Sequence, residues 1–115
     1  KAAKIKITGN GLLFMLTGAM GDLFRMGKAC GVSSDEILSL FDQFSPTASS
    51  MGRRALAAEG SPVGFAMSMA RKDVGLMLET AGAERLTVLP AIAAAMDAAL
   101  AEGDGDSDFT TLATR

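Results

Sequence analysis

The sequence predicts an all-α fold, a bundle of about five to six helices that begins with one long helix. Apolar residues recur with the period of a helix along every long segment. The one stretch that alternates like a strand has no second strand to pair with. With 115 residues, 49% of them hydrophobic and 21% charged, the chain suits a single domain with a real core rather than a disordered segment.

The first segment has both strand-like and helix-like features. Polar and apolar residues alternate over 4–8, and Asn10-Gly11 then resembles a tight hairpin turn. From Leu12 to Cys30, however, the apolar positions fill one broad arc of a helix. We therefore expect one helix over about 5–30, ended by Gly31.

The opposite side of this long helix carries three glycines, Gly11, Gly18 and Gly21. Each glycine costs about 1 kcal/mol relative to alanine in a helix interior. Their grouping indicates that another backbone or a ligand approaches this side closely. The alternative is that this side of the helix is exposed to solvent and the glycines meet no close neighbour.

Two short helices follow. Ser33-Ser34-Asp35-Glu36 has the capping-box pattern and opens a helix that Ser45-Pro46 ends. A second is expected over about 48–58, before Gly60.

Two further helices are expected over 65–81 and about 90–102, ended by Gly82 and Gly103. In the first of them, Phe65 and Lys72 lie on one side, because seven residues make nearly two turns. A final turn over 109–115 would be capped by Ser107 or Asp108.

Composition excludes several functional classes. Histidine is absent, which removes the usual general base at neutral pH. A net charge of −2 and the lack of Trp and Tyr argue against a nucleic-acid partner. The longest uncharged stretch, residues 7–21, is too short to span a bilayer, so no membrane partner is expected. The single cysteine, Cys30, is expected in the core of an intracellular, cytoplasmic protein.

The acidic loop Asp104-x-Asp106-x-Asp108 invites comparison with a calcium-binding loop. An EF-hand loop requires Gly at its sixth position and Glu at its twelfth, which are Phe109 and Arg115 here. No metal site is therefore expected, and the acids are interpreted as solvated helix caps.

Lys6 and Asn10 are spaced so that they could form a site for acid–base catalysis and substrate binding. Four positions apart on a helix, they lie side by side on one face. A lysine partly withdrawn from water gives up its proton more readily and can act in acid–base catalysis, while an amide can hold a carboxylate or carbonyl. The alternative is an ordinary pair on a solvated helix surface.

The order of these features resembles a known family. The chain is similar to the C-terminal helical domain of the β-hydroxyacid dehydrogenases, which include 3-hydroxyisobutyrate dehydrogenase. The segments that carry this resemblance are, in order, "KITGNGLL", a long helix ending at "GKACGVSSDEIL", "FAMSMARKDVGLML" and "LPAIAAAMDAALAEGDGDSDF". The resemblance implies the C-terminal fold of a 6-phosphogluconate dehydrogenase-like enzyme. It also implies an N-terminal Rossmann domain, absent from this chain, that binds most of an NAD or NADP cofactor.

The resemblance implies roles for four residues. Lys6 would be the catalytic lysine and Asn10, four residues later, would bind the substrate. Lys72 would reach the cofactor, and Phe65, seven residues earlier, would line the nicotinamide and substrate pocket.

The resemblance also bears on Lys4, Gly9 and Asp73. Lys4 would place Thr8 where the family has asparagine, so Lys6 is preferred. Gly9 replaces the first of two asparagines that many members carry. Asp73 would be either a partner of the site or a surface acid.

The implied function is that of the substrate and dimerisation domain, residues 1–115, of an NAD(P)-dependent oxidoreductase. Its substrate would be a small 3-hydroxy acid or the corresponding semialdehyde, and its partners its own Rossmann domain and further copies in a homo-oligomer. The chain begins without Met, so we expect a piece of a longer protein, inactive by itself. The alternatives are a non-catalytic helical interaction module and an imine reductase-like relative, whose proton donor usually differs from Lys6.

Overall fold

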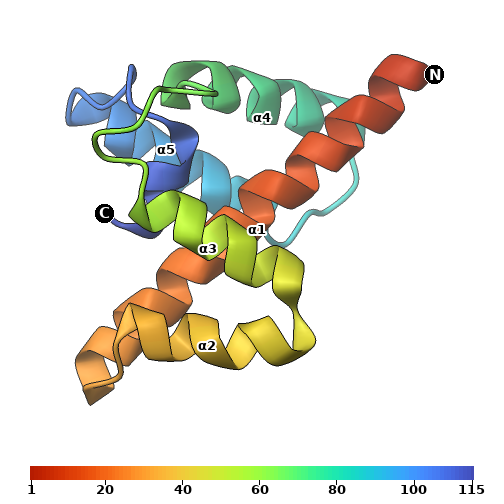
Figure 1. Ribbon diagram of the computed structural model, residues 1–115. Coiled ribbons are helices and arrows are strands. Elements are labelled where there is room, and N and C mark those ends of the chain that lie inside the picture. The colour runs from red at the N-terminus through yellow and green to blue at the C-terminus, as the bar shows by residue number, and fades with distance from the viewer. The chain divides into compact units, whose positions relative to one another are not determined.

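The computed structural model describes residues 1–115, and all of its regular structure is helical (Figure 1). Extended pairing is limited to one isolated bridge between Ala66 and Asp108. The elements in order are α1 (Ala2–Cys30), α2 (Ser34–Phe44), α3 (Pro46–Leu56), α4 (Met67–Ala81), α5 (Leu89–Ala101) and the 3₁₀ helix η1 (Phe109–Ala113). The predicted all-α fold that begins with one long helix is confirmed. No helix is both long and apolar enough to cross a membrane.

The chain forms two compact units. Unit 1 comprises Lys1–Met15 and Val63–Phe109, and unit 2 comprises Leu16–Pro62 and Thr110–Arg115. Helix α1 therefore contributes its first half to unit 1 and its second half to unit 2.

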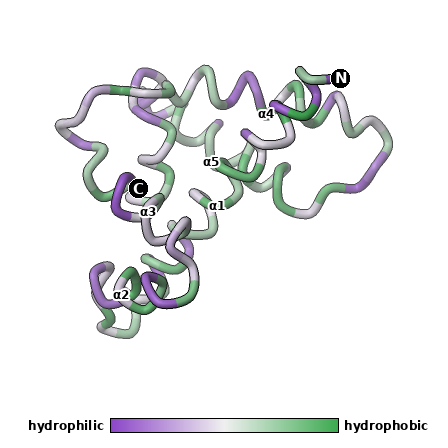
Figure 2. Tube along the Cα trace, turned by 45° about the vertical axis from the view of Figure 1, so that its right-hand side comes forward, coloured by the Kyte–Doolittle hydropathy of each residue, from purple (hydrophilic) through white to green (hydrophobic).

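Unit 1 is built on α4 and α5, which pack side by side (Figure 1). The residues of α4 that face its core recur every three or four positions, as predicted. Helix α5 is almost entirely apolar, and Figure 2 shows it largely in green. The buried side chains of the two helices are Met67, Ala70, Val74, Met77, Ile92, Ala93, Met96 and Ala99.

One ion pair ties these two helices together. Asp97 is the only polar residue of α5 and accepts hydrogen bonds from Arg71 of α4, with Nε to Oδ1 at 2.7 Å and Nη2 to Oδ2 at 3.4 Å. The planar guanidinium matches the carboxylate with two parallel bonds, which fixes the register of the pair.

Unit 2 has its own hydrophobic core. Its buried members come from the second half of α1, from α2 and α3, and from the end of η1: Met20, Phe24, Leu38, Ala55 and Ala113. The predicted capping box of α2 is confirmed. The Ser33 hydroxyl accepts a bond from the Glu36 N–H and the Glu36 carboxylate accepts one from the Ser33 N–H, both at 3.1 Å. These two bonds lower the pKa of Glu36, the backbone bond more than the hydroxyl.

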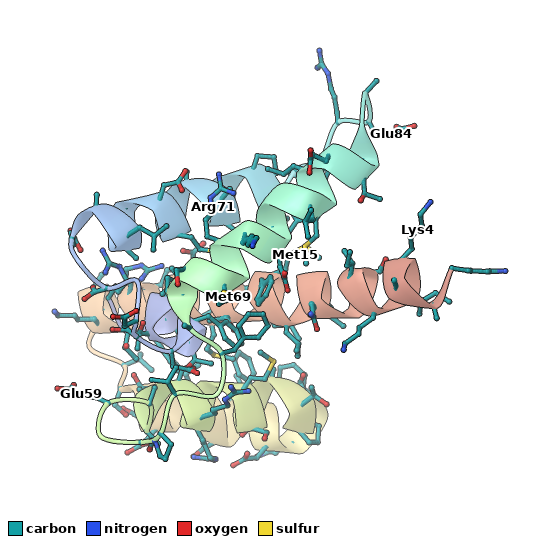
Figure 3. The ribbon with its side chains drawn as sticks, turned by 90° about the horizontal axis from the view of Figure 1, so that it is seen from above. Lys4, Met15, Glu59, Met69, Arg71 and Glu84 are labelled. Atoms are coloured by element: carbon teal, nitrogen blue, oxygen red, sulfur yellow. The ribbon has the colours of Figure 1, made fainter.

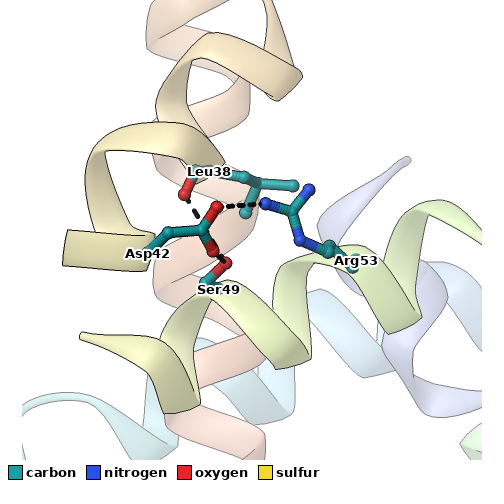
Figure 4. Close-up of polar contacts among 4 residues, drawn as sticks. All are labelled: Leu38, Asp42, Ser49 and Arg53. Atoms are coloured by element: carbon teal, nitrogen blue, oxygen red, sulfur yellow. Dashed lines mark hydrogen bonds and ion pairs between the residues drawn. The ribbon is translucent and has the colours of Figure 1, made fainter. Parts of the chain in front are cut away.

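A polar network joins α2 to α3 (Figure 4). The Asp42 carboxylate accepts a short hydrogen bond from the Ser49 hydroxyl, and Arg53 Nη2 donates to its other oxygen at 2.5 Å. The Ser49 hydroxyl also lies 3.5 Å from the carbonyl oxygen of Leu38. The bond from Ser49 is the largest cause that lowers the pKa of Asp42, with Arg53 acting in the same direction.

The close approach of another backbone, predicted for the glycine side of α1, is found at Gly21, and that backbone belongs to this chain. A Cβ at Gly21 would lie 3.0 Å from the Cα of Ala113 and 3.1 Å from the carbonyl oxygen of Leu112. At Gly11, in unit 1, a Cβ would make only an ordinary contact, 3.4 Å from the side-chain sulfur of Met77.

Three details differ from the prediction. Helix α1 begins at Ala2 rather than near Ile5. Helix α3 begins at Pro46, because proline suits the first turn, where its missing N–H costs nothing. Cys30 is exposed at the end of α1, so the prediction that it lies in the core is wrong.

Candidate active site

Lys6 and Asn10 both lie on α1 within unit 1, so the helical reading of the first segment is correct. Their spacing of four places them one above the other on one face. Lys6 is exposed and Asn10 is half-buried. Lys4, the other candidate lysine, is also exposed near the start of the helix (Figure 3). The hydroxyl of Thr8, which would pair with Lys4, donates instead to its own helix, to the Lys4 carbonyl at 2.9 Å.

Asn10 is held by a residue from another helix. Its Nδ2 donates to Oδ2 of Asp73 on α4 at 3.5 Å, the outer limit of a hydrogen bond. An ionised carboxylate only accepts hydrogen bonds, so the NH₂ of Asn10 must face Asp73. This contact uses a donor of the Asn10 amide, and its oxygen is an acceptor for a hydroxyl or ammonium group. Asp73 is thus a partner of Asn10 rather than a simple surface acid.

Lys72 precedes Asp73 on α4 and is exposed. Consecutive helical residues point about 100° apart, so the two side chains face different directions. Lys72 makes no hydrogen bond or ion pair with Lys6 or Asn10, although all three belong to unit 1. Asn10 and Asp73 are therefore in contact, while Lys72 stands apart as a free cation on the same unit.

Phe65 is not on α4, so the prediction that it shares a helical face with Lys72 is wrong. The helix begins at Met67, and Ala66 before it is extended, with φ −65° and ψ 144°. Periodicity did not reveal this, because the helix boundary is set by hydrogen bonds to a distant part of the chain. The N–H groups of Met67 and Ser68 donate to the carbonyls of Ser107 and Gly105, at 2.7 and 3.0 Å.

The ring of Phe65 is half-buried in an aromatic cluster with Phe14 and Phe109. All three pairs pack edge to face, with ring centroids 5.1 to 5.6 Å apart, a favourable aromatic geometry. Phe14 lies four residues after Asn10 on α1, so Lys6, Asn10 and Phe14 follow one another along a single helical stripe. The cluster therefore fixes Phe65 to the helix that carries Lys6.

The sequence reading missed the role of Asp108 in this region. Its Oδ1 accepts hydrogen bonds from the N–H groups of Gly64 and Phe65, at 3.1 and 3.0 Å. These partners are more than forty residues away, so no local pattern marks the contact.

The side chains of unit 1 therefore offer an exposed amine, an amide with a fixed orientation, an aromatic ring and a second amine. This set suits recognition of a small anionic or carbonyl-bearing molecule and transfer of a proton to or from it. No group of three or more His, Cys, Asp or Glu side chains is placed to hold a metal ion.

Comparison with solved structures shows which fold this is. A structure of 3-hydroxyisobutyrate dehydrogenase from Mycobacterium tuberculosis with L-serine is similar to this chain, with a TM-score of 0.74 at 18% sequence identity. The match covers 96% of this chain and 42% of that one, so this chain spans less than half the length of that enzyme. At this identity the likeness shows a shared fold.

Comparison of sequences shows the family. The search of curated proteins returned no match. The family profile described as "NAD-binding of NADP-dependent 3-hydroxyisobutyrate dehydrogenase" matches residues 1–115, the whole chain. The chain therefore belongs to this family, among the β-hydroxyacid dehydrogenases that its sequence resembles.

Proposed function

We propose that this chain is the helical substrate and dimerisation domain of an NAD(P)-dependent oxidoreductase that acts on a small 3-hydroxy acid or the corresponding semialdehyde. The observation that carries the proposal is the Lys6–Asn10 pair on α1, whose amide is oriented by Asp73 of α4. In such a pair the lysine would transfer the proton and the amide would orient the substrate.

The substrate class is supported by the similar structure. The enzyme from M. tuberculosis was described with L-serine, which is itself a 3-hydroxy acid. The composition of unit 1 agrees with a substrate of this kind, because exposed lysines and an oriented amide suit a carboxylate and a hydroxyl in one small molecule.

Lys6 is the proposed proton-transfer residue. During reduction its ammonium donates a proton to the carbonyl oxygen, and during oxidation its amine accepts the proton of the hydroxyl. Its side chain is exposed in this chain, so substrate and cofactor would complete the site by covering it. Asn10 holds the substrate beside Lys6, with its own direction set by Asp73.

The cofactor is NAD or NADP, which supplies or accepts the hydride when bound. Two residues of unit 1, Lys72 and Phe65, are suited to contact the bound cofactor. Lys72 is an exposed cation that would complement the negative charge of the cofactor, and the half-buried ring of Phe65 would line the pocket of its nicotinamide. The proposal assigns most of the cofactor binding to a separate dinucleotide-binding domain with the glycine-rich turn that such domains use.

The test is a pair of lysine variants in the protein that carries this chain together with its dinucleotide-binding domain. Lys6→Ala should lower kcat by about 10²- to 10⁴-fold, the usual contribution of acid–base catalysis. Dinucleotide binding, followed by the fluorescence of the reduced cofactor, should be unchanged.

Lys4→Ala is the matched control. Lys4 is exposed, lies two residues earlier on the same helix and carries the same charge, so its removal should leave kcat within about twofold. Unchanged turnover of Lys6→Ala would remove the catalytic role and leave a non-catalytic helical module. Loss of turnover in Lys4→Ala alone would assign the role to Lys4.

A further inference from the structure

The loop between α5 and η1, residues 102–108, packs on the start of α4 within unit 1. Helix α4 has no side-chain cap at its first residue. Its first two N–H groups are instead satisfied by carbonyls of this loop, Met67 by Ser107 and Ser68 by Gly105. The acidic segment that resembles a solvated loop in the sequence is therefore the cap of a distant helix.

Asp108 is the buried member of this loop, with 6% of its surface exposed. Burying a carboxylate is costly unless hydrogen bonds satisfy it. Here one oxygen accepts from two consecutive backbone N–H groups, those of Gly64 and Phe65. Such charge-assisted bonds are stronger than bonds between neutral groups, so this contact clamps the backbone just before α4.

Phe65 is held on both sides of its α-carbon. Its N–H donates to Asp108, and its carbonyl accepts from the N–H of Phe109 at 2.8 Å. With both backbone groups bound to the same short segment, the direction of its side chain is defined. The ring then contacts Phe14, two turns beyond Lys6 on α1.

We infer that Asp108 is a positioning residue for the proposed reaction, which it influences through Phe65. The inference rests on the proposed function, because it requires the ring of Phe65 to line the substrate and nicotinamide pocket. In this role Asp108 would act without touching the substrate or the nicotinamide. Its carboxylate fixes the backbone of Gly64 and Phe65, and this fixes where the ring lies along the stripe of Lys6 and Asn10.

The test is a double-mutant cycle in the full protein, with kcat and KM measured for a 3-hydroxy acid. Asp108→Ala should lower kcat/KM by about ten- to hundredfold, as expected for a misplaced binding group. In a Phe65→Ala background, Asp108→Ala should change kcat/KM by less than about twofold, because the ring that Asp108 positions is absent. Asp108→Asn keeps an oxygen acceptor, so it should restore kcat/KM to within about threefold of the unchanged protein.

A general loss of structure predicts a different result. If Asp108→Ala lowers kcat/KM equally in both backgrounds, Asp108 stabilises the fold without acting through Phe65, and the inference is overturned. Unchanged kinetics of Phe65→Ala overturn it as well. Where Asp108→Ala does not fold, Asp108→Glu takes its place in the cycle, because its longer side chain displaces the accepting oxygen while keeping the charge.

Lys6→Ala, measured alongside, separates this inference from the proposed function. Loss of turnover in Lys6→Ala together with additive effects in the cycle rejects the role of Asp108 alone. Full turnover in Lys6→Ala rejects the proposed function, and the role of Asp108 falls with it.

Discussion

Replacing Gly27 by alanine tests how the turn between α1 and α2 is built. Gly27 is buried on the last turns of α1, and its carbonyl accepts a bond from the N–H of Val32 at 2.8 Å. Gly31 between them has a φ of 80°, so the helix ends in a left-handed cap with a six-residue hydrogen-bonded loop. A Cβ at position 27 would lie 2.7 Å from the carbonyl oxygen of Val32 and 2.6 Å from Cδ1 of Ile37.

The expected change in the free energy of unfolding is the balance of two opposing effects. Alanine gains about 1 kcal/mol over glycine in a helix interior. The Ile37 methyl group can rotate away, but the Val32 oxygen belongs to the backbone of the turn, about 0.7 Å inside an ordinary contact of 3.4 Å. Overpacking of this kind costs about 1–3 kcal/mol. Gly27→Ala should therefore lower the free energy of unfolding by up to about 2 kcal/mol.

Gly9→Ala is the matched control on the same helix. Gly9 is exposed, and a Cβ there has no neighbour within 4 Å. This variant should gain the full helix preference of about 1 kcal/mol. Urea denaturation followed by far-ultraviolet circular dichroism should thus separate the two variants by about 2 kcal/mol, because only one of them forces the turn to move. Equal stability of Gly9→Ala and Gly27→Ala would refute this reasoning.

Four further predictions concern unit 2 and the whole chain. Ser33→Ala should lower the free energy of unfolding by about 1 kcal/mol by removing the cap of α2, and unchanged urea denaturation would contradict this. Ser49→Ala should raise the pKa of Asp42 toward its ordinary value, because the hydroxyl of Ser49 is the largest cause that lowers it. Since a lowered pKa stabilises the fold above the unfolded value and this effect disappears as the pH falls through the folded value, Ser49→Ala should begin acid unfolding at higher pH. A carbon NMR titration of Asp42 that is the same in both proteins would rule this out. The chain of residues 1–115 should show no NAD(P)-dependent oxidation of a 3-hydroxy acid and should form a homodimer or larger assembly at micromolar concentration, because Ile5, Met26 and Phe44 are each about two-thirds exposed. Turnover by this chain, or a monomer mass in light scattering, would contradict these two expectations.

The helices were predictable because their signals are local. Gly31, Gly60, Gly82 and Gly103, each expected after a helix, all have positive φ. The capping box of Ser33 and Glu36 forms as its sequence pattern predicts. Such contacts join residues a few positions apart, so the pattern of residue types is enough to reveal them.

The candidate site was predictable only in part. The spacing of Lys6 and Asn10 predicts a shared face once α1 is recognised as a helix. The contact between Asn10 and Asp73 was not predictable from spacing, because it joins residues 63 positions apart. The place of Phe65 was not predictable either, since helical periodicity extends over two residues that the distant loop 102–108 holds outside the helix.

The sequence by itself determined that the chain is helical, where most of its helices begin and end, and which lysine and asparagine share a turn. These properties depend on backbone preferences and on side chains within one or two turns of each other. Only the tertiary structure decided that Cys30 is exposed, that Asp73 orients Asn10, and that Asp108 holds Phe65. Those outcomes depend on which helices pack together, and packing brings into contact residues that no local pattern connects.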